Sequence, residues 1–220
     1  MTGSDFPPTI SALEKIPRKK AYLVRLSDGN EIRVAEEDVP RFALAPGVSV
    51  DAGLLRELDG RHERSGTRDA ALRLLKVRPR TEGELRRALR TRGFGGAAIG
   101  AVVGDLKAAG EVNDRLFARL WVAERMGRGV GRRRILAELR AKRVDEATAL
   151  EETEAQYGPE DELANARQAA LKRLGRLSSI PAERRARRIH SFLLRQGFDS
   201  DIAREAVRYA LGSAGGEGDQ

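Results

Sequence analysis

Clustered arginines are the side chains of this sequence with the clearest capacity for chemistry. Ten basic residues lie between Arg115 and Arg143 against two acidic ones, and a second basic cluster surrounds Arg187. The planar guanidinium group binds phosphates and carboxylates through paired hydrogen bonds. Arg133 and Arg140 are seven residues apart, so they share one face of a helix. We predict a surface that contacts a phosphate backbone or an acidic protein, and its members are Arg132, Arg133, Arg134, Arg140, Lys142, Arg143, Arg184, Arg185, Arg187 and Arg188. The alternative is that these arginines only keep a helical surface soluble.

An acidic segment follows the first basic cluster. Between Asp145 and Glu162 there are eight acidic residues and no basic ones. Carboxylates at this density could bind a divalent ion or act as general acid and base, which would make the chain a hydrolase that uses Glu151 or Glu152. Their irregular spacing instead favours a solvated face. The segment could also pair with a basic repeat or a partner. We therefore predict that the chain is not an enzyme and that it binds no metal and no cofactor.

Two histidines and two glycine-rich segments fit structural roles better than chemical ones. His62 and His190 have no carboxylate at catalytic or metal-binding spacing beside them, so we predict surface histidines. Residues 93–98, Gly-Phe-Gly-Gly-Ala-Ala, match the loose form of a dinucleotide fingerprint, but that fingerprint requires a preceding strand and a helix is predicted here. Residues 127–131, Gly-Arg-Gly-Val-Gly, are not followed by a Walker lysine. Both segments are predicted to be joints between helices.

Composition and charge describe a binding protein of the cytoplasm. The 220 residues carry a formal net charge of +8, and 34% of them are charged. Such a charge favours polyanions or acidic surfaces through salt-sensitive attraction. Aromatic residues make up only 5% of the chain, so any binding to nucleic acid is expected to be non-specific. Cysteine is absent, and no apolar stretch approaches the roughly 18 residues that span a bilayer, so we expect a reducing compartment and no membrane contact.

The N-terminal part predicts a small α/β domain. Residues 21–34 alternate apolar and polar side chains on both sides of Ser27-Asp-Gly-Asn30, which is typical of a β-hairpin. Residues 9–16 are predicted to add a third strand, and residues 36–42 a short helix. We assign residues 1–60 to this domain and residues 61–66 to a linker.

From residue 67 onward the apolar spacing is helical, and a repeat is visible. Three similar segments begin at Leu89, Leu139 and Leu193, which are separated by 50 and 54 residues. Each is predicted to join two helices, and in two of them a glycine can adopt the left-handed conformation. We predict a mainly α fold of three tandem three-helix repeats, nine helices in an elongated curved array. The repeats are assigned to residues 67–110, 111–157 and 158–211, and residues 212–220 to a flexible tail.

Four stretches, in their order and spacing, resemble the RecX family, modulators of the RecA recombinase. They are Ala71-Leu-Arg-Leu-Leu75, Arg80-Thr-Glu-Gly-Glu-Leu85, Gly110-Glu-Val-Asn-Asp-Arg-Leu-Phe-Ala118 and Gly131-Arg-Arg-Arg-Ile-Leu-Ala-Glu-Leu139. The resemblance covers roughly residues 69–211, and the hairpin resembles the extension of longer members. Arg143 departs from the glycine that the family usually has at its second joint.

The resemblance implies a function and a partner. It implies a curved array of three-helix repeats that lodges in the groove of a RecA filament on single-stranded DNA and limits filament growth, ATP hydrolysis and strand exchange. The arginines named above would then contact the filament or its DNA, in DNA recombination, repair and the SOS response. The residues alone leave a second function open, that of a non-specific nucleic-acid-binding repeat protein acting on single-stranded or duplex DNA. We expect a monomer in either case.

Overall fold

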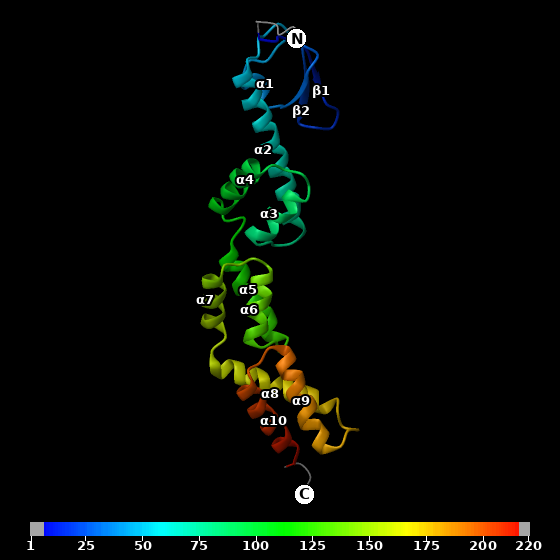
Figure 1. Cartoon of the computed structure of the whole chain (residues 1–220), viewed down its shortest axis with the longest axis vertical. Coiled ribbons are helices and arrows are strands. Elements are labelled where there is room, and N and C mark those ends of the chain that lie inside the picture. The colour runs from blue at the N-terminus through cyan, green and yellow to red at the C-terminus, as the bar shows by residue number, and fades with distance from the viewer. Residues whose placement is uncertain (1–6, 216–220) are drawn as a thin grey trace, which may run out of the picture. The chain divides into compact units, whose positions relative to one another are not determined.

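The computed structural model describes residues 7–215 and divides into two compact units. Unit 1 comprises the chain up to Arg78 together with Leu85–Glu111, and unit 2 comprises Pro79–Glu84 together with the chain from Val112 onward. The described residues form one three-stranded sheet and ten helices (Figure 1). The mainly helical fold predicted from the sequence is therefore confirmed. None of the helices in this range combines the length and the hydropathy that a bilayer crossing requires.

The sheet of unit 1 contains β1 (Ile10–Lys15), β2 (Ala21–Leu26) and β3 (Glu31–Ala35), paired antiparallel in that order. The predicted hairpin and the predicted third strand are both confirmed. Gly29 in the turn has a φ of +85°, a conformation that glycine adopts without steric cost. The buried face of the sheet packs on α1 (Asp38–Arg41) and on the first half of α2. The core there consists of Ile10, Val24, Leu26, Val34, Leu44, Val50 and Leu58.

Helix α2 (Ala52–Val77) corrects the predicted linker. Residues 61–66 lie inside this continuous helix, and His62 with them. Proline is absent between its ends, and the interior glycines each cost only about 1 kcal/mol relative to alanine, which packing offsets. The helix begins where the Asp51 side chain accepts a hydrogen bond from the amide of Leu54, and it ends before Arg78-Pro79, because a residue before proline disfavours the helical conformation. One helix therefore serves both the sheet and the first repeat.

Nine helices form three groups of three, as predicted. The first group is α2, α3 and α4, the second is α5, α6 and α7, and the third is α8, α9 and α10. Their bounds are α3 (Glu82–Arg90), α4 (Gly96–Ala108), α5 (Asp114–Gly127), α6 (Arg132–Ala141), α7 (Glu146–Gln156), α8 (Pro159–Gly175), α9 (Ala182–Gln196) and α10 (Ser200–Gly215). Of the predicted flexible tail, residues 212–215 continue α10 and residues 216–220 lie outside the described residues.

Each group turns between its second and third helix through a residue with left-handed backbone. The φ angles are +86° at Gly93, +64° at Arg143 and +92° at Gly197. The amides of Phe94, Val144 and Phe198 then donate to the carbonyl oxygens of Leu89, Leu139 and Leu193. The predicted joints are confirmed, and the second adopts the same geometry without glycine. For a residue with a Cβ this conformation costs about 1–2 kcal/mol.

In unit 2, groups at the start of another helix also donate hydrogen bonds to carbonyl oxygens at these joints. The amides of Gly131 and Arg133, at the start of α6, donate to the carbonyl oxygens of Gln196 and Gly197 at N···O distances of 2.9 and 3.2 Å. Before α3, the Thr81 hydroxyl donates to the carbonyl oxygen of Lys142 at 2.6 Å. The start of α6 lies close to the third joint, because a Cβ on Gly131 would lie 2.4 Å from the carbonyl carbon of Gly197.

We predict that Gly83 and Arg143 are coupled energetically. A Cβ on Gly83 would lie 2.4 Å from the Cβ of Arg143, so Gly83→Ala should destabilise unit 2 by about 1–3 kcal/mol through overpacking. In an Arg143→Gly background the same change should be neutral or stabilising, because alanine is the better helix former. Urea denaturation of the two single variants and the double variant measures this coupling. An equal loss in both backgrounds would contradict the contact.

Candidate nucleic-acid interface

The α6 arginines of the predicted surface are mostly paired with carboxylates of unit 2. Arg132 pairs with Glu154 at 2.7 Å, Arg133 with Asp199 at 2.9 Å, Arg134 with Glu138 at 3.1 Å and Arg140 with Glu146 at 2.6 Å. Two of these carboxylates belong to the acidic segment. The interpretation of that segment as a face that pairs with a basic repeat is therefore confirmed for Glu146 and Glu154.

The paired arginines differ in exposure. The side chains of Arg133 and Arg140 are 70% and 71% exposed, whereas that of Arg132 is 24% exposed. Exposed ion pairs contribute only about 0–1 kcal/mol, so Arg133 and Arg140 can exchange their partners for another anion at little cost. Arg143 lies exposed at the joint, and no ion pair joins it to a described carboxylate.

Lys142 is held inside the repeat. Its Nζ atom lies 4.2 Å from the centre of the Trp121 ring and 3.2 Å from a Glu84 carboxylate oxygen, and its side chain is 20% exposed. Phe117 stacks on Trp121 with 5.8 Å between ring centres. Trp121 therefore packs between helices, and Lys142 contributes to that packing rather than to an open surface.

Glu138 also stabilises the cluster of Phe117, Trp121 and Lys142. Its carboxylate accepts hydrogen bonds from Trp121 Nε1 at 3.1 Å, Arg125 Nε at 2.6 Å and Arg134 Nε at 3.1 Å. Burial opposes its charge, but the hydrogen bonds from Arg134 and Arg125 outweigh that effect and lower the pKa of Glu138.

Glu151 and Glu152, the carboxylates of the hydrolase alternative, are occupied by arginines. Glu152 is buried and lies 3.1 Å from Arg119 and 3.6 Å from Arg115, and Glu151 pairs with Arg115. Among the described residues, no group of three or more acidic or histidine side chains could hold a metal ion. This geometry gives the segment a structural role.

The α9 cluster is different, because most of its arginines pair with no carboxylate that the structure describes. Arg185 donates to the carbonyl oxygens of Ile180 and Ser178 at 2.5 and 2.7 Å and so closes the turn before the helix. Arg184, Arg187 and Arg188 form no ion pair with any carboxylate among the described side chains. Together with Ser191 and Arg195 they line an open hollow of about 490 Å³. Arg195 was not among the predicted members of the surface, although its spacing of seven residues from Arg188 places both on one helix face.

The glycine segments are joints, as predicted. The amide of Gly95, at the start of α4, donates to a Glu63 carboxylate oxygen at 2.7 Å, and α3 precedes the segment instead of a strand. The chain's own carboxylate therefore occupies the place where a pyrophosphate would bind. Gly129 has a φ of +70° between α5 and α6.

The predicted surface histidines are instead partly buried, because both lie on packed helices. Burial and the nearby charge of Arg33 lower the pKa of His62. His190 lies on α9, and its Nε2 atom is buried without a hydrogen-bond partner among the residues that the structure describes.

Three family models match the chain in order. They describe the first, second and third three-helix domains of RecX and match residues 68–106, 113–151 and 160–207. Regulatory protein RecX of Amycolatopsis mediterranei is 39% identical over 145 residues, which are 66% of this chain and 82% of that protein. Regulatory protein RecX of Thermobifida fusca is 39% identical over 153 residues, 69% of this chain and 82% of that protein.

Solved structures agree in fold. A crystal structure of regulatory protein RecX aligns with a TM-score of 0.71 at 24% identity and covers 91% of this chain and 98% of that chain. The crystal structure of RecX from Lactobacillus salivarius aligns with a TM-score of 0.62 at 23% identity, over 68% of this chain and 97% of that one.

We predict that Glu138 stabilises the second repeat in a pH-dependent way. Its pKa is lowered in the folded state, so its contribution is present above the ordinary value of 4.5 and is lost as the pH falls through the folded value. Glu138→Gln should reduce the free energy of unfolding by about 1–2 kcal/mol at pH 7. The difference from the parent protein should shrink below pH 4, as urea denaturation at several pH values would show. A difference that is constant with pH would contradict this role.

Proposed function

This chain belongs to the RecX family of regulatory proteins, and we propose that it binds the filament of a RecA recombinase on single-stranded DNA and limits the filament's growth, ATP hydrolysis and strand exchange. It acts in the cytoplasm as a stoichiometric regulator of recombination and DNA repair, as a monomer and without catalysis. The observation that carries the proposal is the presence of three three-helix domains on one chain, all of which carry exposed arginines.

Several contacts on one chain suit a repeating partner. Each three-helix domain offers a modest surface, and contacts to successive protomers of a filament would reinforce one another because they are linked covalently. Bridging of this kind stabilises the bound state and hinders the rearrangements that accompany filament growth. Exposed arginines at two places in unit 2, α6 with its joint and α9, provide the anion-binding ends of such a bridge.

The residues of the predicted surface fall into two groups, those whose side chains make internal contacts and those whose side chains are open to a partner. Arg132, Lys142 and Arg185 serve internal contacts, so changing them threatens the fold. The members open to a partner are Arg133, Arg134, Arg140 and Arg143 near α6 and Arg184, Arg187 and Arg188 on α9. We expect the contacts to the filament protein or to its DNA among this second group.

A second function, non-specific binding to nucleic acid, is favoured by the α9 arginines that pair with no carboxylate among the described side chains. About five phosphate contacts would give a slope of roughly −4 to −5 for log affinity against log salt on duplex, and a shallower slope on single strands. In this alternative the recombinase would be affected only because the DNA is covered.

We predict that the protein inhibits ATP hydrolysis by the cognate recombinase assembled on single-stranded DNA. Inhibition should occur at protein concentrations too low to coat the DNA, because bridging acts on the filament. The measurement is a titration of ATP hydrolysis, with binding to DNA alone measured in the same buffer. Retention of full hydrolysis while the protein is bound to DNA would favour the nucleic-acid-binding alternative.

We further predict that Arg133→Glu, Arg140→Glu and Arg143→Glu together raise the protein concentration needed for half-inhibition about tenfold or more. The triple variant should remain folded, because these side chains are exposed, and circular dichroism checks this. Lys142→Glu is the contrasting variant, since it should lower thermal stability by disturbing Trp121 and Glu84. Unchanged inhibition by the folded triple variant would remove α6 from the contact surface.

A further inference from the structure

The turn between β1 and β2 carries the most concentrated positive charge of the N-terminal sheet. Its sequence is Ile16-Pro-Arg-Lys-Lys20, and we name Arg18, Lys19 and Lys20 the cationic turn. All three residues are exposed, and none forms an ion pair with a carboxylate that the structure describes. The turn lies about 16 Å along β1 from the start of that strand. It precedes residue 68, where the family models begin to match, so the proposed function gives it no role.

The backbone of this turn is strained at its first basic residue. The amide of Lys19 donates to the carbonyl oxygen of Ile16 at 3.2 Å, with Pro17 and Arg18 at the two central positions, and Arg18 has a φ of +60°. Proline followed by a residue with positive φ is typical of a type II turn, whose second central position favours glycine or asparagine. An arginine there carries a steric cost that glycine avoids. Strain of this kind at an exposed charged residue is a sign of function.

Carboxylates of the sheet pair with basic residues outside the cationic turn. Glu36 lies beside the turn, because its amide donates to the carbonyl oxygen of Lys20 at 3.1 Å, but its carboxylate pairs with Lys15 at 2.6 Å. Glu14, on β1, pairs with Arg25 at 2.6 Å. These pairs leave the charge of the cationic turn available to a partner, without the loss of an internal ion pair.

Positive charge continues from the cationic turn onto β3. Arg33, on β3, is exposed and pairs with no carboxylate among the described side chains. Burial lowers the pKa of His62 on α2, and the charges of Arg33 and Lys19 lower it further. Two aspartates oppose this effect without cancelling it. Lys19 and Arg33 therefore both lie close to the same imidazole ring, and their positive fields add in that part of unit 1.

The surroundings of the cationic turn favour the phosphates of a nucleic-acid duplex as its partner. Protein interfaces are centred on apolar and aromatic side chains, and membrane surfaces bind buried apolar groups as well as charge. None of the large apolar side chains exposed in the described chain belongs to this turn. Tyr22, which follows it, is half-buried with Lys15 Nζ 6.0 Å from its ring centre, so it is no free platform for the bases of a single strand. A duplex presents one phosphate charge per about 1.7 Å of its axis and requires no such platform.

We propose that the cationic turn binds the phosphate backbone of double-stranded DNA. The guanidinium group of Arg18 and the ammonium groups of Lys19 and Lys20 contact phosphates, and Arg33 adds longer-range attraction. These contacts are independent of base sequence, because phosphates are common to all sequences. The N-terminal sheet thus gives unit 1 a duplex site of its own, in addition to the arginines of unit 2. The inference goes beyond the proposed function and requires no recombinase.

The test is fluorescence anisotropy of a labelled twenty-base-pair DNA duplex with the full chain and no recombinase. Arg18→Ala, Lys19→Ala and Lys20→Ala together should weaken binding about tenfold, and the slope of log affinity against log salt should become shallower by about 2 to 3, which is roughly 0.9 for each lost phosphate contact. The matched control combines Arg25→Ala, Arg64→Ala and Arg68→Ala, which removes the same charge from exposed arginines of unit 1 that pair with carboxylates. The control should bind within about twofold of the parent protein.

Single changes at Arg18 separate binding from the geometry of the turn. Arg18→Gly should weaken duplex binding about threefold and yet raise the midpoint of thermal denaturation, because glycine relieves the backbone strain. Arg18→Lys, which keeps the charge, should bind the duplex within about twofold of the parent protein. A role confined to the turn would change the stability of Arg18→Gly without changing its binding.

Equal losses of affinity in the two triple variants would overturn the proposal, as would an Arg18→Gly variant that binds the duplex like the parent protein. So would unchanged duplex binding by the first triple variant combined with weaker association with vesicles of anionic phospholipid. A larger loss on a single strand of the same length than on the duplex would also count against it. Because no recombinase is present, these outcomes are separate from the success or failure of filament inhibition.

Discussion

Two helix starts in unit 2, those of α6 and α3, depend on backbone carbonyl oxygens that another repeat supplies. The first amides of a helix have no partner within it, and they make its N-terminus a natural site for anions. At α6 these amides donate to Gln196 and Gly197 and to the carboxylate of Glu162, and before α3 the Thr81 hydroxyl connects the first turn to Lys142. The packing of one repeat on another thus occupies these anion-binding positions. At these two helix starts, phosphate could therefore bind only through side chains on the helix faces.

Those helix faces differ in how many of their arginines pair with carboxylates of the same chain. Around α6, carboxylates from α7 and from the start of α10 approach the arginines and leave little free positive charge. On α9, Arg184, Arg187 and Arg188 have no such partner in the described part of the chain. Internal pairing thus separates side chains that organise the repeats from side chains that are available to a partner. The difference in pairing is electrostatic and local, because α6 and α9 are each the second helix of a three-helix repeat.

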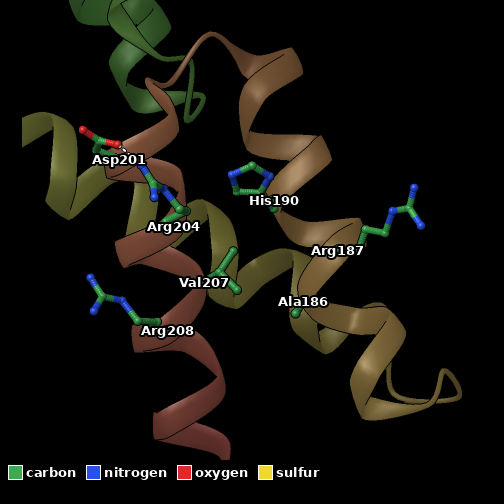
Figure 2. Close-up of a pocket in the computed structure, with 7 residues that line it drawn as sticks. All are labelled: Ala186, Arg187, His190, Asp201, Arg204, Val207 and Arg208. Carbon is green, nitrogen blue, oxygen red and sulfur yellow. Dashed lines mark hydrogen bonds and ion pairs between the residues drawn. The ribbon is translucent and has the colours of Figure 1, made fainter.

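Features that depend on local periodicity could be predicted from the sequence. The strands, the nine helices of the repeats and the three joints follow from apolar spacing and turn residues, and Arg143 keeps the joint geometry because tertiary packing holds it in the left-handed conformation. The continuity of α2 was missed, because its glycines resemble a break when the packing that offsets them is unknown. The division of the arginines could not be predicted, since the partner of Arg133 is Asp199, which lies 66 residues away. The hollow between α9 and α10, which His190 helps to line, could not be predicted either, because it forms only where α10 approaches α9 (Figure 2).

The pairing of Arg133 with Asp199 gives the acidic residues an evolutionary role. Both side chains are largely exposed, so the loss of the carboxylate would cost the fold little and would release a positive charge at an existing surface. Selection can therefore strengthen or weaken attraction to a polyanion by changing glutamates and aspartates, while the arginines themselves stay in place. A change at these acidic positions would therefore alter the attraction of this surface to a polyanion without any change in the arginines.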